Sequence, residues 1–236
     1  MNFSKIKPIL IAALFLALIM RGWQIRERFM YSHDNDLAGW IVKDIVVDRH
    51  LRLIGQETSA RGIFIGPLWY YSVIPFYLFA HMDPIGSVAN SLLISLASIC
   101  SLYFVTSRLY GGRAAGIAAL LYAGSELLST TEREVVPTTP VMLWSIWFYY
   151  AVDLTLRGKK SGLILAAVLL GLVWHLNLAL VLLSPLILLG VWKNRRSFKL
   201  ADVIKPALIV IIMSLPLLVF EFRHGFIQTR ALASSL

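Results

Sequence analysis

The feature that most limits the fold of this chain is a series of apolar segments, separated by short polar stretches. The segments are about 20 residues long, the length of α-helix needed to cross the hydrocarbon core of a bilayer. Hydrophobic residues make up 58% of the chain and charged residues only 15%, whereas soluble domains carry roughly 25% charged residues. The sequence therefore predicts an all-α, polytopic transmembrane protein.

The basic residues indicate how the helices are oriented. The net charge of +9 comes from short clusters between the apolar segments, not from one continuous stripe. Such clusters are typical of cytoplasmic loops, and they argue against nucleic acid as a partner. The clusters are Lys5 and Lys7; Arg108 and Arg113; Arg157, Lys159 and Lys160; and Lys193, Arg195, Arg196 and Lys199.

The topology depends on the segment Pro67–Ala80, which is short, contains Pro75 and is rich in aromatic residues. We expect it to lie in the membrane interface, because all four basic clusters are then cytoplasmic. The first apolar segment follows two lysines, as in a signal peptide, but no small-residue cleavage site follows it, so we expect a retained helix. The expected membrane helices, about seven in number, are Ile6–Trp23, Ser87–Ser107, Ala114–Thr130, Thr139–Leu156, Gly162–His175, Leu178–Trp192 and Val203–Phe222.

This topology separates the carboxylates. Only Asp153 and Asp202 lie on the cytoplasmic side, and the other eleven lie outside or near the outer face. Carboxylates have little influence on orientation. A function on the outer face and the solubility of a long external loop both remain open as explanations. We expect one membrane domain over residues 1–236, and Cys100, the only cysteine, excludes an intrachain disulfide.

Several short segments then follow one another in a recognisable order. They are Tyr31–Asp36, Leu53–Gly55, Gly66–Tyr71, Ser107–Gly116 and Pro216–Phe226. Their order and spacing resemble the C-type membrane glycosyltransferases that use polyprenyl-phosphate sugars. Protein O-mannosyltransferases and the aminoarabinose transferase of lipid A belong to that family.

The resemblance implies a catalytic site on the external face. A sugar would pass from a polyprenyl-phosphate donor to an acceptor hydroxyl on a lipid, glycan or protein, with inversion at the anomeric carbon and without a cofactor. One departure concerns the acidic motif, which has two adjacent carboxylates in the family, whereas Asn35 separates Asp34 from Asp36 here. Relatives continue beyond Leu236, so we expect a fragment or a reduced member.

The resemblance makes Asp34 the candidate general base, with Asp36 second. A base of this kind typically contributes about 10²–10⁴-fold in rate. The alternative is helix capping, which aspartate does well, and Asp36 is the expected cap of a helix over Leu37–Val47. The two carboxylates could instead hold a divalent cation; we expect metal-free catalysis.

Arg223 and His224 follow the last expected helix and are candidates for binding the departing phosphate, because an arginine fork suits phosphate. Snorkelling to the interface is the alternative. Glu57 and Arg61 lie in a turn-rich stretch before the interfacial segment. They are candidate substrate-binding residues, with a solvated loop charge and a lipid-headgroup contact as the alternatives.

Arg133 and His175 complete the candidate substrate-binding set. For Arg133 the structural alternative is an ion pair with Glu132 or Glu134. For His175 a proton role is open because histidine titrates near neutral pH, and the alternative is a hydrogen-bonded histidine at a helix end. Glu126 would gain a site role only if the expected helix Ala114–Thr130 keeps it inside the bilayer.

A second function class remains open: a non-catalytic membrane protein, such as a flippase for lipid-linked sugars or a partner subunit. Transporters place broken or polar helices at the bilayer midplane. The expected helices Ser87–Ser107 and Thr139–Leu156 have no charge there, but Pro185 and Pro216 interrupt two others.

Overall fold

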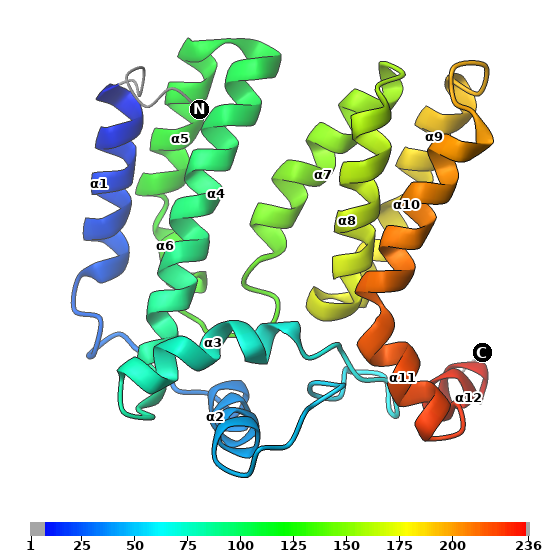
Figure 1. The fold of residues 1–236 in the computed structure, drawn as a ribbon. Coiled ribbons are helices and arrows are strands. Elements are labelled where there is room, and N and C mark those ends of the chain that lie inside the picture. The colour runs from blue at the N-terminus through cyan, green and yellow to red at the C-terminus, as the bar shows by residue number, and fades with distance from the viewer. Residues whose placement is uncertain (1–7, 235–236) are drawn as a thin grey trace. The chain divides into compact units, whose positions relative to one another are not determined.

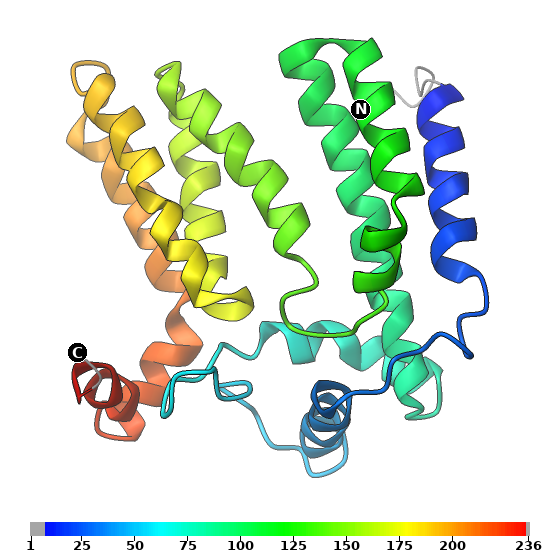
Figure 2. The same ribbon diagram turned by 180° about the vertical axis from the view of Figure 1, so that it is seen from behind.

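The computed structural model describes residues 8–234, and within that range the regular elements are all helices (Figures 1 and 2). The all-α prediction is therefore confirmed for the described residues. The chain forms two compact units. Unit 1 comprises Met1–Gly39 and Pro75–Ile146, and unit 2 comprises Trp40–Ile74 and Trp147–Leu236. The unit boundaries fall within three helices, α2 (His33–Val46), α3 (Leu68–Phe79) and α7 (Val141–Leu156).

Unit 1 is built around α1 (Pro8–Gly22), α4 (Ser87–Tyr110) and α5 (Gly112–Gly124), with the short η2 (Pro84–Gly86) and α6 (Glu126–Thr131) at their ends. Small side chains allow close approach of such helices. At Gly116, for example, a Cβ would lie 2.6 Å from Ile9 Cδ1. The buried core consists of Ala13, Ala17, Ile99, Ala119, Tyr122 and Ala123.

Unit 2 is built around α8 (Lys160–Leu176) and α10 (Leu200–Met213), which lie side by side in both views (Figures 1 and 2). The two helices approach closely at Gly171, where a Cβ would lie 2.8 Å from Met213 Cβ. The other helices of this unit that lie wholly within it are η3 (Leu178–Leu183), α9 (Ser184–Lys193), α11 (Leu215–Arg223) and α12 (Ile227–Ser234).

Three predicted helices are broken in the structure. The expected helix Ala114–Thr130 ends at Gly124, because Ser125 adopts an extended backbone and its Oγ accepts from Leu128 N–H (3.3 Å) as the N-cap of α6. Serine and threonine are favoured at the N-cap of a helix. The predicted unbroken helix Ala114–Thr130 is therefore wrong, and Glu126 lies exposed in the first turn of α6, so the condition for its site role is not met.

The other two breaks involve proline. The expected helix Leu178–Trp192 divides into η3 and α9, with Pro185 in the first turn of α9. The expected helix Val203–Phe222 divides into α10 and α11, which are bent by 58° at Ser214, just before Pro216. A proline has no N–H to continue the helix, so it is favoured at the start of a new helix.

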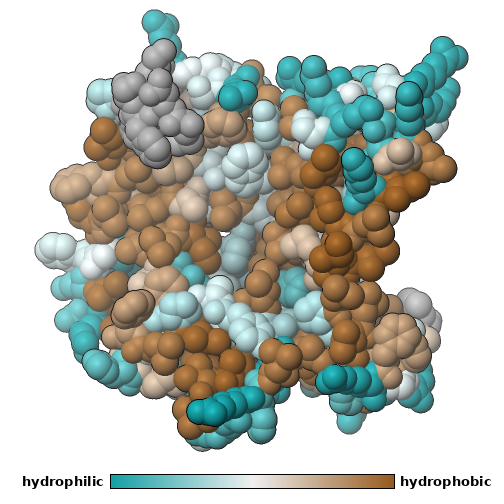
Figure 3. Space-filling view, in the orientation of Figure 1, coloured by the Kyte–Doolittle hydropathy of each residue, from teal (hydrophilic) through white to brown (hydrophobic). Residues whose placement is uncertain are grey.

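Helix length bears on the predicted membrane spans. Within residues 8–234, one helix, Pro84–Tyr110, is long and apolar enough to cross a membrane, or two if the bent pair Leu200–Met213 and Leu215–Arg223 counts as one span. The helix lengths therefore do not confirm about seven spans. Large hydrophobic side chains are nevertheless exposed along many helices, as Figure 3 shows for one face.

Candidate functional site

The acidic motif lies in the first turn of α2, which begins at His33, four residues earlier than predicted. The buried side chain between the two aspartates fixes this helix start. The Ser32 N–H and Oγ–H both donate to Asn35 Oδ1, at 2.8 and 2.9 Å. Asn35 Nδ2 donates to the carbonyl of Val135 (3.3 Å). Asn35 therefore ties the start of α2 to the segment that follows α6.

The two aspartates flank this anchor and differ in environment. Asp34 is half-buried, whereas Asp36 is exposed and its Oδ1 accepts from the Tyr31 hydroxyl (3.0 Å). This bond raises the pKa of Tyr31, because it favours the protonated phenol. Asp36 is the fourth residue of α2, so its predicted role as the N-cap is wrong. Both carboxylates lie where the helix dipole favours negative charge.

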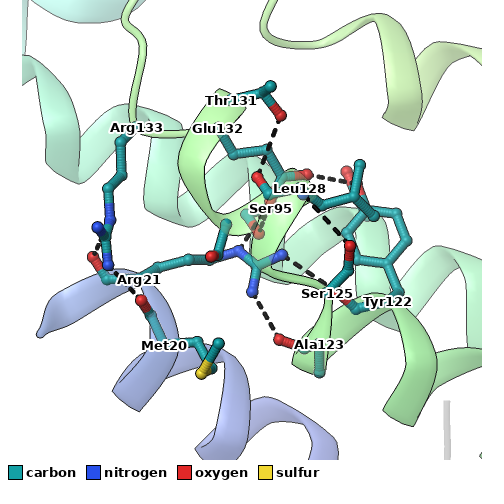
Figure 4. A network of polar contacts seen from close by, with 12 residues as sticks. Met20, Arg21, Ser95, Tyr122, Ala123, Ser125, Leu128, Thr131, Glu132 and Arg133 are labelled. Atoms are coloured by element: carbon teal, nitrogen blue, oxygen red, sulfur yellow. Dashed lines mark hydrogen bonds and ion pairs between the residues drawn. The ribbon is translucent and has the colours of Figure 1, made fainter. Parts of the chain in front are cut away.

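A buried ionic network, shown in Figure 4, joins four parts of unit 1. Arg21 Nε at the end of α1 donates to Glu132 Oε2 (2.7 Å), and both side chains are nearly inaccessible to solvent. Glu132 also accepts from Ser95 Oγ in α4 (2.7 Å) and from the Tyr122 hydroxyl in α5. Arg21 Nη1 donates to the carbonyl of Ala123 (2.9 Å). A buried charge needs a partner of opposite charge and hydrogen bonds, and here Arg21 and Glu132 are such partners for each other.

Arg133 is a candidate phosphate ligand, and the alternative is an ion pair with Glu132 or Glu134; among the described residues it forms neither ion pair. Its guanidinium is 5% exposed and donates to three backbone carbonyls at the end of α1, those of Met20, Arg21 (3.2 Å) and Trp23 (3.5 Å). The carboxylate partner predicted for Arg133 is therefore wrong, because Glu132 pairs with Arg21. Arg133 instead caps the orphan carbonyls of a helix C-terminus.

In unit 2, Glu57 and Arg61 belong to a short hairpin-like loop over residues 55–65. Its backbone is held by Gly55 N–H to Ile65 O and by Thr58 N–H to Ile63 O, both at 2.7 Å. The Glu57 carboxylate accepts from the Gly62 N–H across this loop. Glu57 and Arg61 are both exposed. The structure therefore fits the alternative of exposed loop charges.

Arg223 and His224 lie at the end of α11, beside this hairpin. The Phe64 N–H donates to Gln228 Oε1 of α12 (2.7 Å), and the Phe64 and Phe220 rings are 6.3 Å apart. The His224 ring stacks on Phe220 at 4.1 Å, and its Nδ1 bonds the Phe220 carbonyl (2.8 Å). Arg223 is exposed. The fold thus brings the hairpin with Glu57 and Arg61 against the helix that carries Arg223 and His224.

Unit 2 also contains an apolar cavity of about 400 Å³, between the segment that precedes α3 and the bend from α10 to α11. Two of its lining residues are bonded to each other: the Tyr71 hydroxyl accepts from Arg52 N–H (3.0 Å) and donates to the Arg52 carbonyl (3.1 Å). Arg52 Nε pairs with Asp44 Oδ2 (2.6 Å). The cavity is lined by Leu51, Arg52, Leu53, Pro67, Leu68, Tyr71, His175, Ile212, Met213 and Pro216.

His175 forms part of the cavity wall. Its Nε2 lies 2.9 Å from the carbonyl of Met213, which can only accept, so Nε2 carries the proton. Nδ1 is buried and has no hydrogen-bond partner among the described residues. It lies against Gly66, where a Cβ would approach it to 2.1 Å. The predicted hydrogen-bonded histidine at a helix end is therefore confirmed.

The candidate residues therefore divide between the units. Asp34, Asp36 and Arg133 belong to unit 1; Glu57, Arg61, His175, Arg223 and His224 belong to unit 2. Sequence reasoning missed Arg52, Tyr71 and the pair of Arg21 and Glu132. The signal for the pair was present, since ionisable residues next to apolar segments are costly and need a partner.

Comparison with known proteins gives one match. The sequence model described as dolichyl-phosphate-mannose-protein mannosyltransferase matches residues 69–220, more than half of the chain. No curated protein and no solved structure matches the chain. Among the described residues, no three His, Cys, Asp or Glu side chains lie close enough together to hold a metal ion.

Proposed function

Because the chain belongs to the dolichyl-phosphate-mannose-protein mannosyltransferase family, and so is a membrane glycosyltransferase of the mannosyltransferase kind, we propose that it transfers a sugar from a polyprenyl-phosphate donor to an acceptor hydroxyl. The proposal places this reaction on the external membrane face and gives it inversion at the anomeric carbon. The observation that carries it is the family match from α3 to α11.

In unit 1 the proposed general base is Asp34. Its carboxylate takes the proton from the acceptor hydroxyl while the oxygen attacks the anomeric carbon. The bond from that carbon to the phosphate oxygen breaks, and the lipid phosphate leaves with the electron pair. The position of Asp34 supports this role, because the side chain is half-buried on a helix start that Asn35 holds in place. A base that is already held in position loses little of its rate contribution to reorientation.

In unit 2 the apolar cavity has a size and a lining that suit part of a prenyl chain, since ligand pockets are mostly apolar with a few polar groups. We assign phosphate contacts in this unit to Arg61 and Arg223, which are exposed on neighbouring elements. Exposed guanidinium groups can form bidentate bonds to phosphate oxygens. Glu57, His175 and His224 have roles in holding their own segments.

Asp34→Asn tests the proposal, because asparagine retains the size and capping ability of aspartate but not its basicity. With a radiolabelled polyprenyl-phosphate sugar and purified protein in liposomes, we expect transfer to fall by about 10²–10⁴-fold at an unchanged melting temperature. Asp36→Asn, the matched control, should retain most of the activity. Wild-type turnover by Asp34→Asn would overturn the assignment of the base.

Two further measurements separate the alternatives. Activity that survives chelation by EDTA supports the metal-free reaction, and activity restored by Mg²⁺ or Mn²⁺ supports a cation held by Asp34 and Asp36. A flippase would move the lipid-linked sugar across the liposome membrane without forming a glycosylated product, and its rate would not respond to Asp34→Asn.

A further inference from the structure

The end of unit 2 opposite α11 and α12 carries a dense group of cations. Two turns lie there side by side, one between α7 and α8 and one between α9 and α10 (Figures 1 and 2). Together the stretches 153–160 and 193–202 hold seven basic side chains and two carboxylates. Figure 3 shows hydrophilic side chains gathered at this end, with hydrophobic ones along the helices beneath. We call this surface, residues 157–160 and 193–199, the basic end.

The two turns are tied into one rigid surface. Asn194 Nδ2 lies within hydrogen-bond distance of three carbonyls, those of Thr155 (3.1 Å), Leu156 (3.0 Å) and Gly190 (3.1 Å). Lys160 Nζ in the first turn of α8 pairs with Asp202 in the first turn of α10 (2.8 Å). The two turns that carry the cations are therefore held together before any ligand arrives.

The two carboxylates next to the basic end already form ion pairs. Asp153 pairs with Arg157 (2.9 Å) and Asp202 with Lys160. The remaining cations are all exposed, and none lies within salt-bridge distance of a carboxylate among the described residues, although the charge of Lys199 also acts on Asp202. They are Lys159, Lys193, Arg195, Arg196 and Lys199. Seven cations against two carboxylates leave these two stretches with a net charge of +5, and an anionic ligand would relieve the repulsion between the cations.

The surroundings indicate which anion fits. Trp192 is 65% exposed and Leu200 is 78% exposed, so large apolar side chains border the cations directly. The Arg195 guanidinium lies 5.5 Å from the centre of the Trp192 ring. An exposed tryptophan beside arginine suits the headgroup level of a bilayer. A nucleic acid could stack a base on Trp192, but it would leave the apolar side chain of Leu200 in water, and a free phosphate would meet only solvated side chains.

We propose that the basic end binds the headgroups of anionic phospholipids, such as phosphatidylglycerol. The site is separate from the proposed transfer reaction and does not depend on it. Clusters of lysine and arginine next to a membrane segment attract anionic lipid, and each such residue raises the affinity by roughly fivefold. Since the cations here are held on one surface, they act together on neighbouring headgroups.

The test measures the melting temperature of the purified protein in neutral detergent while lipid is added. Phosphatidylglycerol should raise it saturably, and chain-matched phosphatidylcholine, inorganic phosphate and a short oligonucleotide should not. In R195Q/R196Q the half-saturating fraction of phosphatidylglycerol should rise by roughly 25-fold. The matched control R108Q/R113Q removes the same charge from the turn between α4 and α5, and should shift it by less than about fivefold.

Three results would overturn the proposal: an equal effect of both double variants, an equal response to phosphatidylcholine, or a response reproduced by phosphate or the oligonucleotide. If R195Q/R196Q melts lower than the wild type without lipid, K159Q/K193Q takes its place, because both side chains are exposed and make no ion pair among the described residues. The same shift of roughly 25-fold is expected for that pair.

Discussion

The buried pair of Arg21 and Glu132 makes the most demanding prediction about stability. In Arg21→Met the arginine side chain is replaced by an apolar one of similar length, and Glu132 loses its cation while it stays 9% exposed. The hydroxyls of Ser95 and Tyr122 still donate to the carboxylate, but they do not neutralise it. The substitution also leaves the carbonyl of Ala123 at the end of α5 without its donor.

The expected cost follows from this geometry. Removing one partner of a buried pair and leaving the other charged costs about 3–5 kcal/mol. For a chain of this size each kcal/mol lowers the melting temperature by roughly 2–4 °C. Arg21→Met should therefore lower the melting temperature by roughly 6–20 °C.

A second variant tests whether the lost stability comes from the unpaired charge of Glu132. In Arg21→Met/Glu132→Gln the lone buried charge is gone, and the amide oxygen of the introduced glutamine can still accept from one hydroxyl. We therefore expect the double variant to melt several degrees above Arg21→Met. Both are measured by thermal unfolding in the same detergent. A double variant that melts at or below Arg21→Met would refute the reasoning, because Glu132 would then not be an uncompensated carboxylate in the single variant.

Three further predictions concern unit 2. Gly66→Ala places a Cβ 2.1 Å from His175 Nδ1 and should lower the melting temperature by roughly 2–12 °C, whereas Gly22→Ala, with nothing within 4 Å, should change it little. Asn194→Ala removes the donor shared by three carbonyls and should lower the melting temperature by several degrees, while Asn194→Asp, which has no N–H to donate, should not rescue it. The hydrogen bond from His50, followed by the charge of Arg52, lowers the pKa of Asp44 below the ordinary value of 3.8. The ionised Asp44 therefore stabilises the fold fully above pH 3.8, and this stabilisation is lost as the pH falls further. The melting temperature of Asp44→Asn should consequently fall less steeply than that of the wild type below about pH 4, and equal slopes would contradict the assignment.

The sequence predicted the helices well where the signal was local. Long apolar runs mark α4, α7 and α8, and the predicted and observed bounds of these helices differ by at most three residues. The family resemblance, read from short motifs in order, is confirmed by the match over residues 69–220. Both inferences use residues that are neighbours in the chain, so no knowledge of the tertiary contacts was needed.

The contacts that organise the candidate site are not local. Arg21 and Glu132 are 111 positions apart, and Asn35 and Val135 are 100 apart. No spacing rule pairs such residues, which explains why the sequence suggested Glu132 or Glu134 as a partner for the adjacent Arg133 and did not link Glu132 to Arg21. At the acidic motif, the sequence drew attention to the two aspartates. The residue that fixes the helix start is the asparagine between them, because only its side chain both donates and accepts at that place.

The broken helices show how a small error in secondary structure hides a site. In a straight helix over Val203–Phe222 the Met213 carbonyl would accept from the Leu217 N–H of the next turn, and the helix would present no bend. The actual bend at Ser214 leaves the Met213 carbonyl free to accept from His175, in the last turn of α8. The same bend places Met213 and Pro216 in the wall of the cavity opposite Tyr71 and Arg52. Pro216 gave the signal for the break, because a proline ends the hydrogen-bond ladder of the preceding turn. The cavity proposed for the prenyl chain therefore exists because α10 and α11 are two helices and not one.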